Sequence, residues 1–107
     1  MDMLVSVVIP AYNESKYIEI PLKGLSNQTF KDFEIIVADN NSTDNTIAIA
    51  RKYGARVINV PQQGAVFAYN GGMNEAKGEI IVNIDADTQP PTNWLETIAN
   101  ALKPRCV

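Results

Sequence analysis

Four short runs of apolar, mostly β-branched residues alternate along the chain with segments whose apolar residues recur at helical spacing. The runs have the length and composition of buried strands, and they cover residues 4–9, 33–38, 55–60 and 79–84. The helical patterns begin after Ser15, after Ser42, at about Ala65 and after Thr92. The sequence therefore predicts a strand and a helix in strict alternation.

Several residues predict where these elements begin and end. Pro10 and Pro61 are expected to stop the first and third strands, because proline has no N–H for a strand ladder. Pro21 should start, shift or kink the first helix. Gly54 is expected to end the second helix in a left-handed conformation, and Ser42 and Thr92 are expected to be N-caps.

Strands that are apolar throughout, each followed by a helix, predict a parallel sheet covered by helices on both faces. Right-handed crossovers favour a doubly wound, mainly parallel α/β sheet in the order 3-2-1-4. At 107 residues, the chain is expected to form a single domain, residues 1–107. In such a fold, ligands bind beyond the carboxyl ends of the strands, where the winding direction reverses.

Three polar segments fall where predicted strands end. These segments are residues 10–14, 39–42 and 85–87. Because carboxyl ends of parallel strands meet at one edge of a sheet, we expect the three segments to converge on one site.

Asp85 and Asp87 follow the fourth apolar run at positions i and i+2, so both carboxylates are expected to face the same side. Two carboxylates held close together repel each other, and a hard cation such as Mg²⁺ or Mn²⁺ relieves that repulsion. Taken alone, the pair is also consistent with a polar turn that closes a strand.

The other polar residues at this edge each have two interpretations. Tyr12 can stack on a nucleobase or pin its loop to the sheet. Asn13 and Glu14 fit either contacts to sugar hydroxyls or the start of a helix. Asp39 is suited to accept hydrogen bonds from a base or ribose, and Asn40 can read a base edge or belong to a turn.

Two glycines lie inside the third predicted helix, although each costs about 1 kcal/mol there relative to alanine. Gly71 and Gly72 indicate a close approach to backbone or ligand, and we favour packing of the helix on the sheet. Trp94 and Leu95 are interpreted as core residues of the last helix. No glycine-rich dinucleotide motif or P-loop is present.

Composition narrows the function classes further. A net charge of −3 disfavours a nucleic-acid binder, because such proteins carry a basic surface. The chain has no histidine and one cysteine, Cys106, so neither histidine chemistry nor an intrachain disulfide is available. The sequence shows no signal peptide and no apolar run of about 20 residues, so a cytoplasmic protein is expected.

Taken together, the motifs resemble family 2 glycosyltransferases of GT-A fold. The shared segments are Val5-Ser6-Val7-Val8-Ile9-Pro10-Ala11-Tyr12-Asn13-Glu14, Asn27-Gln28-Thr29-Phe30, Asp39-Asn40-Asn41-Ser42-Thr43-Asp44, Gly64 to Gly72 with Gly78-Glu79-Ile80, and Asp85-Ala86-Asp87. They occur in the family's order and spacing over nearly the whole chain.

The resemblance implies a binding site for a nucleotide-diphosphate sugar. It implies that the base and ribose pocket is lined by Pro10, Ala11, Tyr12 and Glu14, with Asp39 and Asn40 at the base. It places Asp85 near the ribose and metal, Ala86 between the two acids, and Asp87 on the divalent ion, Mg²⁺ or Mn²⁺. The implied reaction inverts the anomeric centre: an acceptor hydroxyl attacks and a carboxylate base removes its proton.

The sequence also departs from the family pattern. Asn40 replaces the second aspartate of the family's D-D-G-S loop, and Tyr69 replaces a frequent arginine. Only the nucleotide-sugar-binding half is recognisable, so the acceptor (glycan, lipid or protein) and the catalytic base are unassigned. The alternative is a non-catalytic nucleotide-binding module, or a fragment that needs a partner for activity. The fourth strand is expected at an open sheet edge, which favours a homo-oligomer.

Overall fold

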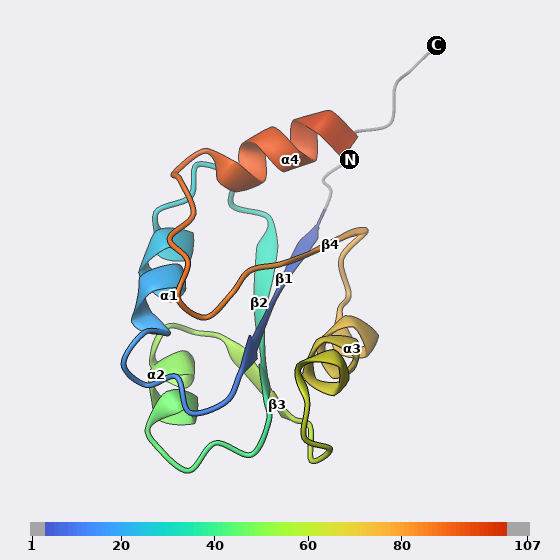
Figure 1. Cartoon of the computed structure of the whole chain (residues 1–107). Coiled ribbons are helices and arrows are strands. Elements are labelled where there is room, and N and C mark those ends of the chain that lie inside the picture. Colours follow the sequence, from blue (N-terminus) through green and yellow to red (C-terminus); the bar gives the residue numbers. More distant parts are fainter. Residues whose placement is uncertain (1–3, 103–107) are drawn as a thin grey trace.

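The computed structural model describes residues 4–102 and confirms the predicted alternation of strands and helices (Figure 1). The strands are β1 (Val5–Ala11), β2 (Phe33–Asp39), β3 (Arg56–Asn59) and β4 (Ile80–Asn83). The helices are α1 (Glu19–Ser26), α2 (Thr46–Lys52), α3 (Ala65–Glu75) and α4 (Trp94–Leu102). Cys106 lies outside the described residues.

The four strands form one parallel sheet in the order β3-β2-β1-β4, as the sequence predicts. Strand β1 lies in the interior and pairs with β2 over its whole length, from Val5 opposite Phe33 to Ala11 opposite Asp39. Its pairing with β4 is shorter and ends where Val8 lies opposite Asn83. The winding direction therefore reverses between β1 and β4, which is where a ligand site is expected.

Alternate residues of β1 pack into two different cores. Val5, Val7 and Ile9 are fully buried in a cluster with residues of α1, α2 and α4. Val8 faces the opposite side and packs with residues of α3. Figure 1 shows α1 and α2 on one side of the sheet and α3 on the other. Both faces of the sheet are therefore covered, which explains why the strands lack polar alternation.

Gly71 and Gly72 allow α3 to lie close to the sheet. A Cβ on Gly72 would overlap the side chain of Val8, and a Cβ on Gly71 would lie 2.6 Å from Cγ2 of Val60. Real Cβ atoms do not approach other atoms this closely, so the interpretation of these glycines as packing residues is confirmed.

The prediction that Pro10 stops β1 is wrong, because the strand continues to Ala11. The Val8 carbonyl accepts a hydrogen bond from Ile84 N, so residue 10 also faces the β4 side. Because the pairing with β4 ends at Val8, the missing N–H of Pro10 leaves no ladder bond unmade.

Two predicted caps differ from the structure. Helix α2 starts at Thr46 after Asn45, so Ser42 is not its N-cap. Helix α4 begins at Trp94, two residues after Thr92. The other end signals are confirmed: Pro21 lies in the first turn of α1, where an N–H has no intrahelical partner.

The predicted end of α2 is also confirmed. Gly54 has a φ of 81° directly after the helix. Its N–H donates to Arg51 O, and the N–H of Ala55 donates to Ala50 O. This pair of bonds is a Schellman motif, and it turns the chain into β3.

Candidate functional site

The segment after β1 leaves the sheet in an extended and then left-handed path. Tyr12 is about half exposed, and Asn13 has a φ of 52°, a conformation that asparagine tolerates better than most residues. Glu14 follows and is partly buried. The segment therefore presents an aromatic ring and a carboxylate beyond the carboxyl end of β1.

Hydrogen bonds tie this segment to the loop after β2. The N–H of Asn13 donates to Ser42 Oγ over 2.9 Å, and the N–H of Thr43 donates back to Asn13 Oδ1 over 2.8 Å. The N–H of Glu14 donates to Thr46 Oγ1 over 2.9 Å. Ser42 thus connects two loops instead of capping a helix.

Asp44 completes this connection between the loops. One carboxylate oxygen accepts from the hydroxyl and the N–H of Thr46, and the other accepts from the N–H of Ser15. The hydrogen bond from the Thr46 side chain is the main reason why the pKa of Asp44 falls from 3.8 to about 2. Asp44 therefore stabilises the turn before α2 and the connection between the two loops.

Asp39 lies at the end of β2 and is completely buried. Its Oδ2 accepts a hydrogen bond from the N–H of Ser42 over 3.0 Å. Its Oδ1 is also buried and has no hydrogen-bond donor among the described residues. A buried oxygen without a donor is costly, so this atom has an unmet capacity to accept a hydrogen bond.

Asn40 uses its side-chain amide to hold the segment between β3 and α3. Its Nδ2 donates to the carbonyls of Val60 and Gln62, over 2.7 and 2.6 Å, and its Oδ1 accepts from the N–H of Gly64. Both amide hydrogens are therefore engaged within the chain. The structure places Asn40 at the predicted site but commits its side chain to shaping that site.

The residues after β4 keep the alternation of a strand. Ile80, Ile84 and Ala86 are buried, Val82 is half-buried, and Asp85 and Asp87 are exposed. The extended geometry behind the predicted common direction of the two aspartates ends at Asp85, because a hydrogen bond from the N–H of Thr88 to Asp85 O closes a turn around Ala86 and Asp87. Both aspartates nevertheless line the same hollow.

Two adjoining hollows bring the predicted residues together. One, of about 390 Å³, is lined by Pro10, Glu14, Ala65, Tyr69, Asn83, Asp85, Ala86 and Asp87. The other, of about 290 Å³, is lined by Pro10, Ala11, Tyr12, Glu14, Asn40, Gln63, Gly64, Ala65 and Ala68. Every predicted site residue lines one of these hollows except Asp39, which is buried. The expected convergence of the three strand ends is confirmed.

Sequence reasoning did not select Ala65, and it noted Tyr69 only as the replacement of a frequent arginine, although α3 contributes both residues to these walls. Ala65 lines both hollows and Tyr69 lines one, because α3 starts at the same edge of the sheet after β3. The edge rule that selected the other loops would also have found this helix start. A larger hollow, about 420 Å³, lies near Phe33 and Tyr53 and contains none of the predicted residues.

The carboxylates of Asp85 and Asp87 fit a hard divalent ion in type and placement. Both are exposed oxygen donors on the wall of the same hollow. Within residues 4–102, no group of three or more metal-ligating side chains occurs. The chain would therefore supply a minority of the ligands, as is usual where phosphate oxygens and water complete the coordination of Mg²⁺.

The structure defines a doubly wound α/β fold with its candidate site at the carboxyl edge of the sheet. Residues 6–106 match the family described as glycosyl transferase family 2, and the chain belongs to that family. Within residues 4–102, no helix is long and apolar enough to cross a membrane.

Known relatives support this assignment. The glycosyltransferase AglE of Haloferax volcanii is 37% identical over 100 residues, which are 86% of this chain and 33% of that protein. The chain thus spans about a third of the length of this relative. This match supports membership of the family, and it covers the smaller part of the relative's length.

Solved structures show the same GT-A fold. TarS of S. aureus (residues 1–349), crystallised with UDP, superposes with a TM-score of 0.86 and 32% identity, over 92% of this chain and 31% of that one. Glucosyl-3-phosphoglycerate synthase of Mycobacterium tuberculosis, crystallised with Mn²⁺, UDP and glucosyl-3-phosphoglycerate, gives a TM-score of 0.80 and 32% identity, over 94% and 39%.

Proposed function

We propose that this chain binds a nucleotide-diphosphate sugar in the two adjoining hollows and supplies the donor site of a metal-assisted, inverting glycosyltransferase. The observation that carries the proposal is the convergence of three strand ends on those hollows. Family membership supports it, and so do the nucleotide complexes of the similar proteins.

In this proposal, the hollow beside Tyr12 takes the nucleoside. The exposed Tyr12 ring offers a face for stacking on the base. Pro10, Ala11 and Glu14 line the walls around the base and ribose. Asp39 is proposed to accept a hydrogen bond from the base or ribose at its unpaired Oδ1, an atom that is buried in the ligand-free chain, and Asn40 shapes the wall through the segment that it holds.

The hollow beside Asp85 and Asp87 takes the diphosphate and its metal ion. Asp87 is proposed as the main metal ligand, and Asp85 would lie near the ribose and the metal. When bound, Mg²⁺ or Mn²⁺ stabilises the negative charge of the departing nucleoside diphosphate. The two carboxylates would hold that ion in the hollow that Pro10 and Tyr69 also line.

Transfer itself needs an acceptor hydroxyl and a base. The hydroxyl attacks the anomeric carbon on the face opposite the diphosphate, which inverts that centre, and the base takes the hydroxyl proton. We assign the base to none of residues 4–102. The donor site does not identify the acceptor, whether a glycan, lipid or protein.

Calorimetric titration of the chain with UDP, GDP and dTDP, each with and without Mn²⁺, tests the donor site. We expect one nucleotide to bind more tightly with Mn²⁺, and Asp87→Asn to remove at least about a tenfold gain in affinity. Asp32→Asn is the matched control, because Asp32 is an exposed aspartate before β2, at the other end of the sheet. Absence of nucleotide binding by the unmodified chain would refute the proposal.

A second candidate function is nucleotide binding without glycosyl transfer by this chain alone. In that case, glycosyl transfer would require a partner. The short β4 strand favours it, because β4 pairs with β1 alone and leaves an open sheet edge within the described part of the chain. A glycosyl-transfer assay with mixed nucleotide sugars and Mn²⁺ separates the two. Nucleotide binding without turnover of any donor supports the second candidate.

A further inference from the structure

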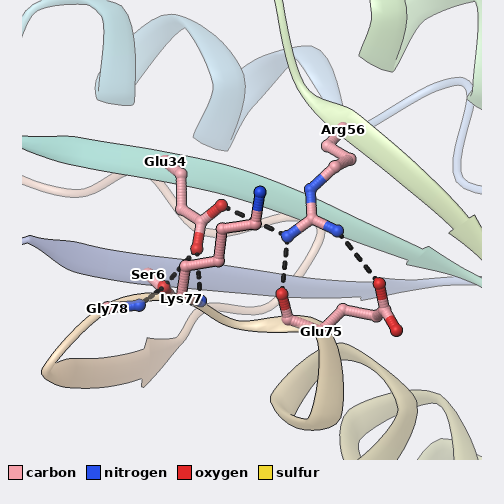
Figure 2. A network of polar contacts seen from close by, with 6 residues as sticks. All are labelled: Ser6, Glu34, Arg56, Glu75, Lys77 and Gly78. Carbon is pink, nitrogen blue, oxygen red and sulfur yellow. Dashed lines mark hydrogen bonds and ion pairs between the residues drawn. The ribbon is translucent and has the colours of Figure 1, made fainter.

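A network of polar contacts lies at the end of the sheet opposite the hollows (Figure 2). Ser6 on β1 is completely buried, and its hydroxyl donates to Glu34 Oε2 on β2 over 2.5 Å. The same hydroxyl oxygen accepts from the N–H of Gly78 over 2.8 Å. Glu34 Oε2 also accepts from the N–H of Lys77 over 2.7 Å. Two strands thus bind the segment that leads into β4.

Arg56 on β3 holds the Glu34 carboxylate in place from its other side. Its Nη2 lies 3.3 Å from Glu34 Oε1 and donates to Glu75 O over 2.6 Å, and its Nη1 contacts Glu75 Oε1. Burial alone would raise the pKa of Glu34, but the bonds from Ser6, Lys77 and Arg56 together lower it below its usual 4.5. Glu34 is therefore held as an oriented carboxylate.

Gly78 fits this network because it has no side chain. A Cβ at this position would lie 2.7 Å from both N and Oγ of Ser6 and 2.8 Å from Leu4 O. A slip of β4 by one residue would bring Lys77 or Glu79 to this position, where its Cβ would clash with β1. Shape and hydrogen bonding therefore select the same register.

The register of β4 determines which way the metal-site aspartates face. Strand β4 lies at an edge, and its pairing with β1 extends only from Val5 opposite Ile80 to Val8 opposite Asn83. Burial of Ile80 and Ile84 in the core favours this register, and the network at the start of the strand adds to it. A slip of one residue moves the strand by about 3.3 Å and turns every side chain to the other face. Asp85 and Asp87 would then leave the wall of their hollow.

We propose that Ser6 and Glu34 are positioning residues for the nucleotide-sugar site: they fix the register of β4 and thereby place Asp85 and Asp87. This inference rests on the proposed function for its second half. Its first half, the register of β4, concerns the ligand-free chain and can be tested separately. Neither residue lines the two hollows, so any effect on binding must be transmitted through the fold, and the measurements below separate transmission through β4 from a general effect.

Amide hydrogen exchange on the ligand-free chain tests the effect on β4. Ser6→Ala removes the hydroxyl and keeps the space, and Glu34→Gln keeps the shape and removes the charge. We expect protection of the Ile80–Ile84 amides to fall about tenfold relative to the Ile35–Val37 amides of β2 in the same molecule. Equal losses in both strands would show a general effect on stability and overturn the proposal.

Tyr53→Phe provides the matched control for exchange. Tyr53 OH donates to Glu19 Oε2 over 2.8 Å, a side-chain bond to a carboxylate that joins α2 to α1 and does not involve β4. We expect this variant to leave the protection of β4 relative to β2 unchanged. The same relative loss at β4 in Tyr53→Phe would also overturn the proposal.

UDP titration with and without Mn²⁺ then tests the effect on the site. In Glu34→Gln we expect the gain in affinity from Mn²⁺ to fall roughly tenfold, while the affinity without metal stays unchanged, because β1 and β2 supply the nucleoside hollow. Equal losses with and without metal, or no loss, would overturn the proposal. If Mn²⁺ does not raise the UDP affinity of the unmodified chain, the proposed metal-assisted function fails. The hydrogen-exchange result still decides whether the network fixes the register of β4.

Discussion

Replacing Asn40 by aspartate tests the role of its side-chain amide. The change keeps the size of the side chain and the acceptor for Gly64 N, but it removes both donated hydrogen bonds. A carboxylate would instead lie against the carbonyl oxygens of Val60 and Gln62, which the amide nitrogen contacts at 2.7 and 2.6 Å. Oxygen atoms that cannot share a hydrogen repel each other, so the loop loses both contacts.

The expected cost follows from these two contacts. Each lost hydrogen bond costs about 1 kcal/mol, and a poorly solvated carboxylate adds a similar amount or more. The free energy of unfolding at pH 7 should therefore fall by about 2–4 kcal/mol, which lowers the melting temperature by roughly 10–20 °C in a domain of this size. UDP affinity should also fall, because Gln63 and Gly64 line the nucleoside hollow.

Asn41→Asp is the matched control for this measurement. Asn41 is the next residue, and its side chain donates one exposed bond to Pro61 O over 2.8 Å. Urea unfolding of both variants at pH 7 and pH 4 gives the comparison. We expect Asn40→Asp to regain stability at pH 4, where its carboxyl is protonated and can donate again. If Asn40→Asp unfolds at the same urea concentration as Asn41→Asp at both pH values, the reasoning is wrong.

Three further predictions address other parts of the molecule. Because folding lowers the pKa of Asp44 from 3.8 to about 2, its stabilising effect should be complete above pH 4 and lost as the pH falls towards 2. An NMR titration should give the lowered pKa, and Asp44→Asn should remove this part of the acid dependence of unfolding. Gly72→Ala should lower the free energy of unfolding by about 1–3 kcal/mol in urea titrations, since the added methyl overlaps Val8, and an unchanged midpoint would contradict that packing. Through the open edge of β4, the chain should form a dimer or larger oligomer, and a monomer mass at all concentrations in ultracentrifugation would count against it.

The order of the strands and the place of the site could be predicted from the sequence. The apolar runs identify the strands, and the parallel topology then places the segments after β1, β2 and β4 at one edge. The strand end that carries Asp85 and Asp87 could also be predicted, although both line one hollow through a turn at Ala86 and Asp87 and not through the extended chain that their spacing suggested.

Contacts between residues far apart in the sequence could not be predicted in this way. Serine is a favoured N-cap residue, yet the Ser42 hydroxyl accepts a hydrogen bond from the N–H of Asn13, 29 positions earlier. Ser6 and Gly78 are 72 positions apart, and only the final register brings them together. The proline rule failed at Pro10 for the same reason, because the rule depends on how far the neighbouring strand extends.

The unpaired oxygen of Asp39 has a consequence for recognition. The folded chain has already removed Oδ1 from water, at an expense of about 1–3 kcal/mol, without a donor from the described residues in return. A ligand that offers an N–H or O–H at this atom gains a hydrogen bond whose desolvation has largely been completed beforehand. If the chain binds a nucleotide as proposed and the atoms that cover Oδ1 move aside, this one atom would favour nucleotides that offer such a group.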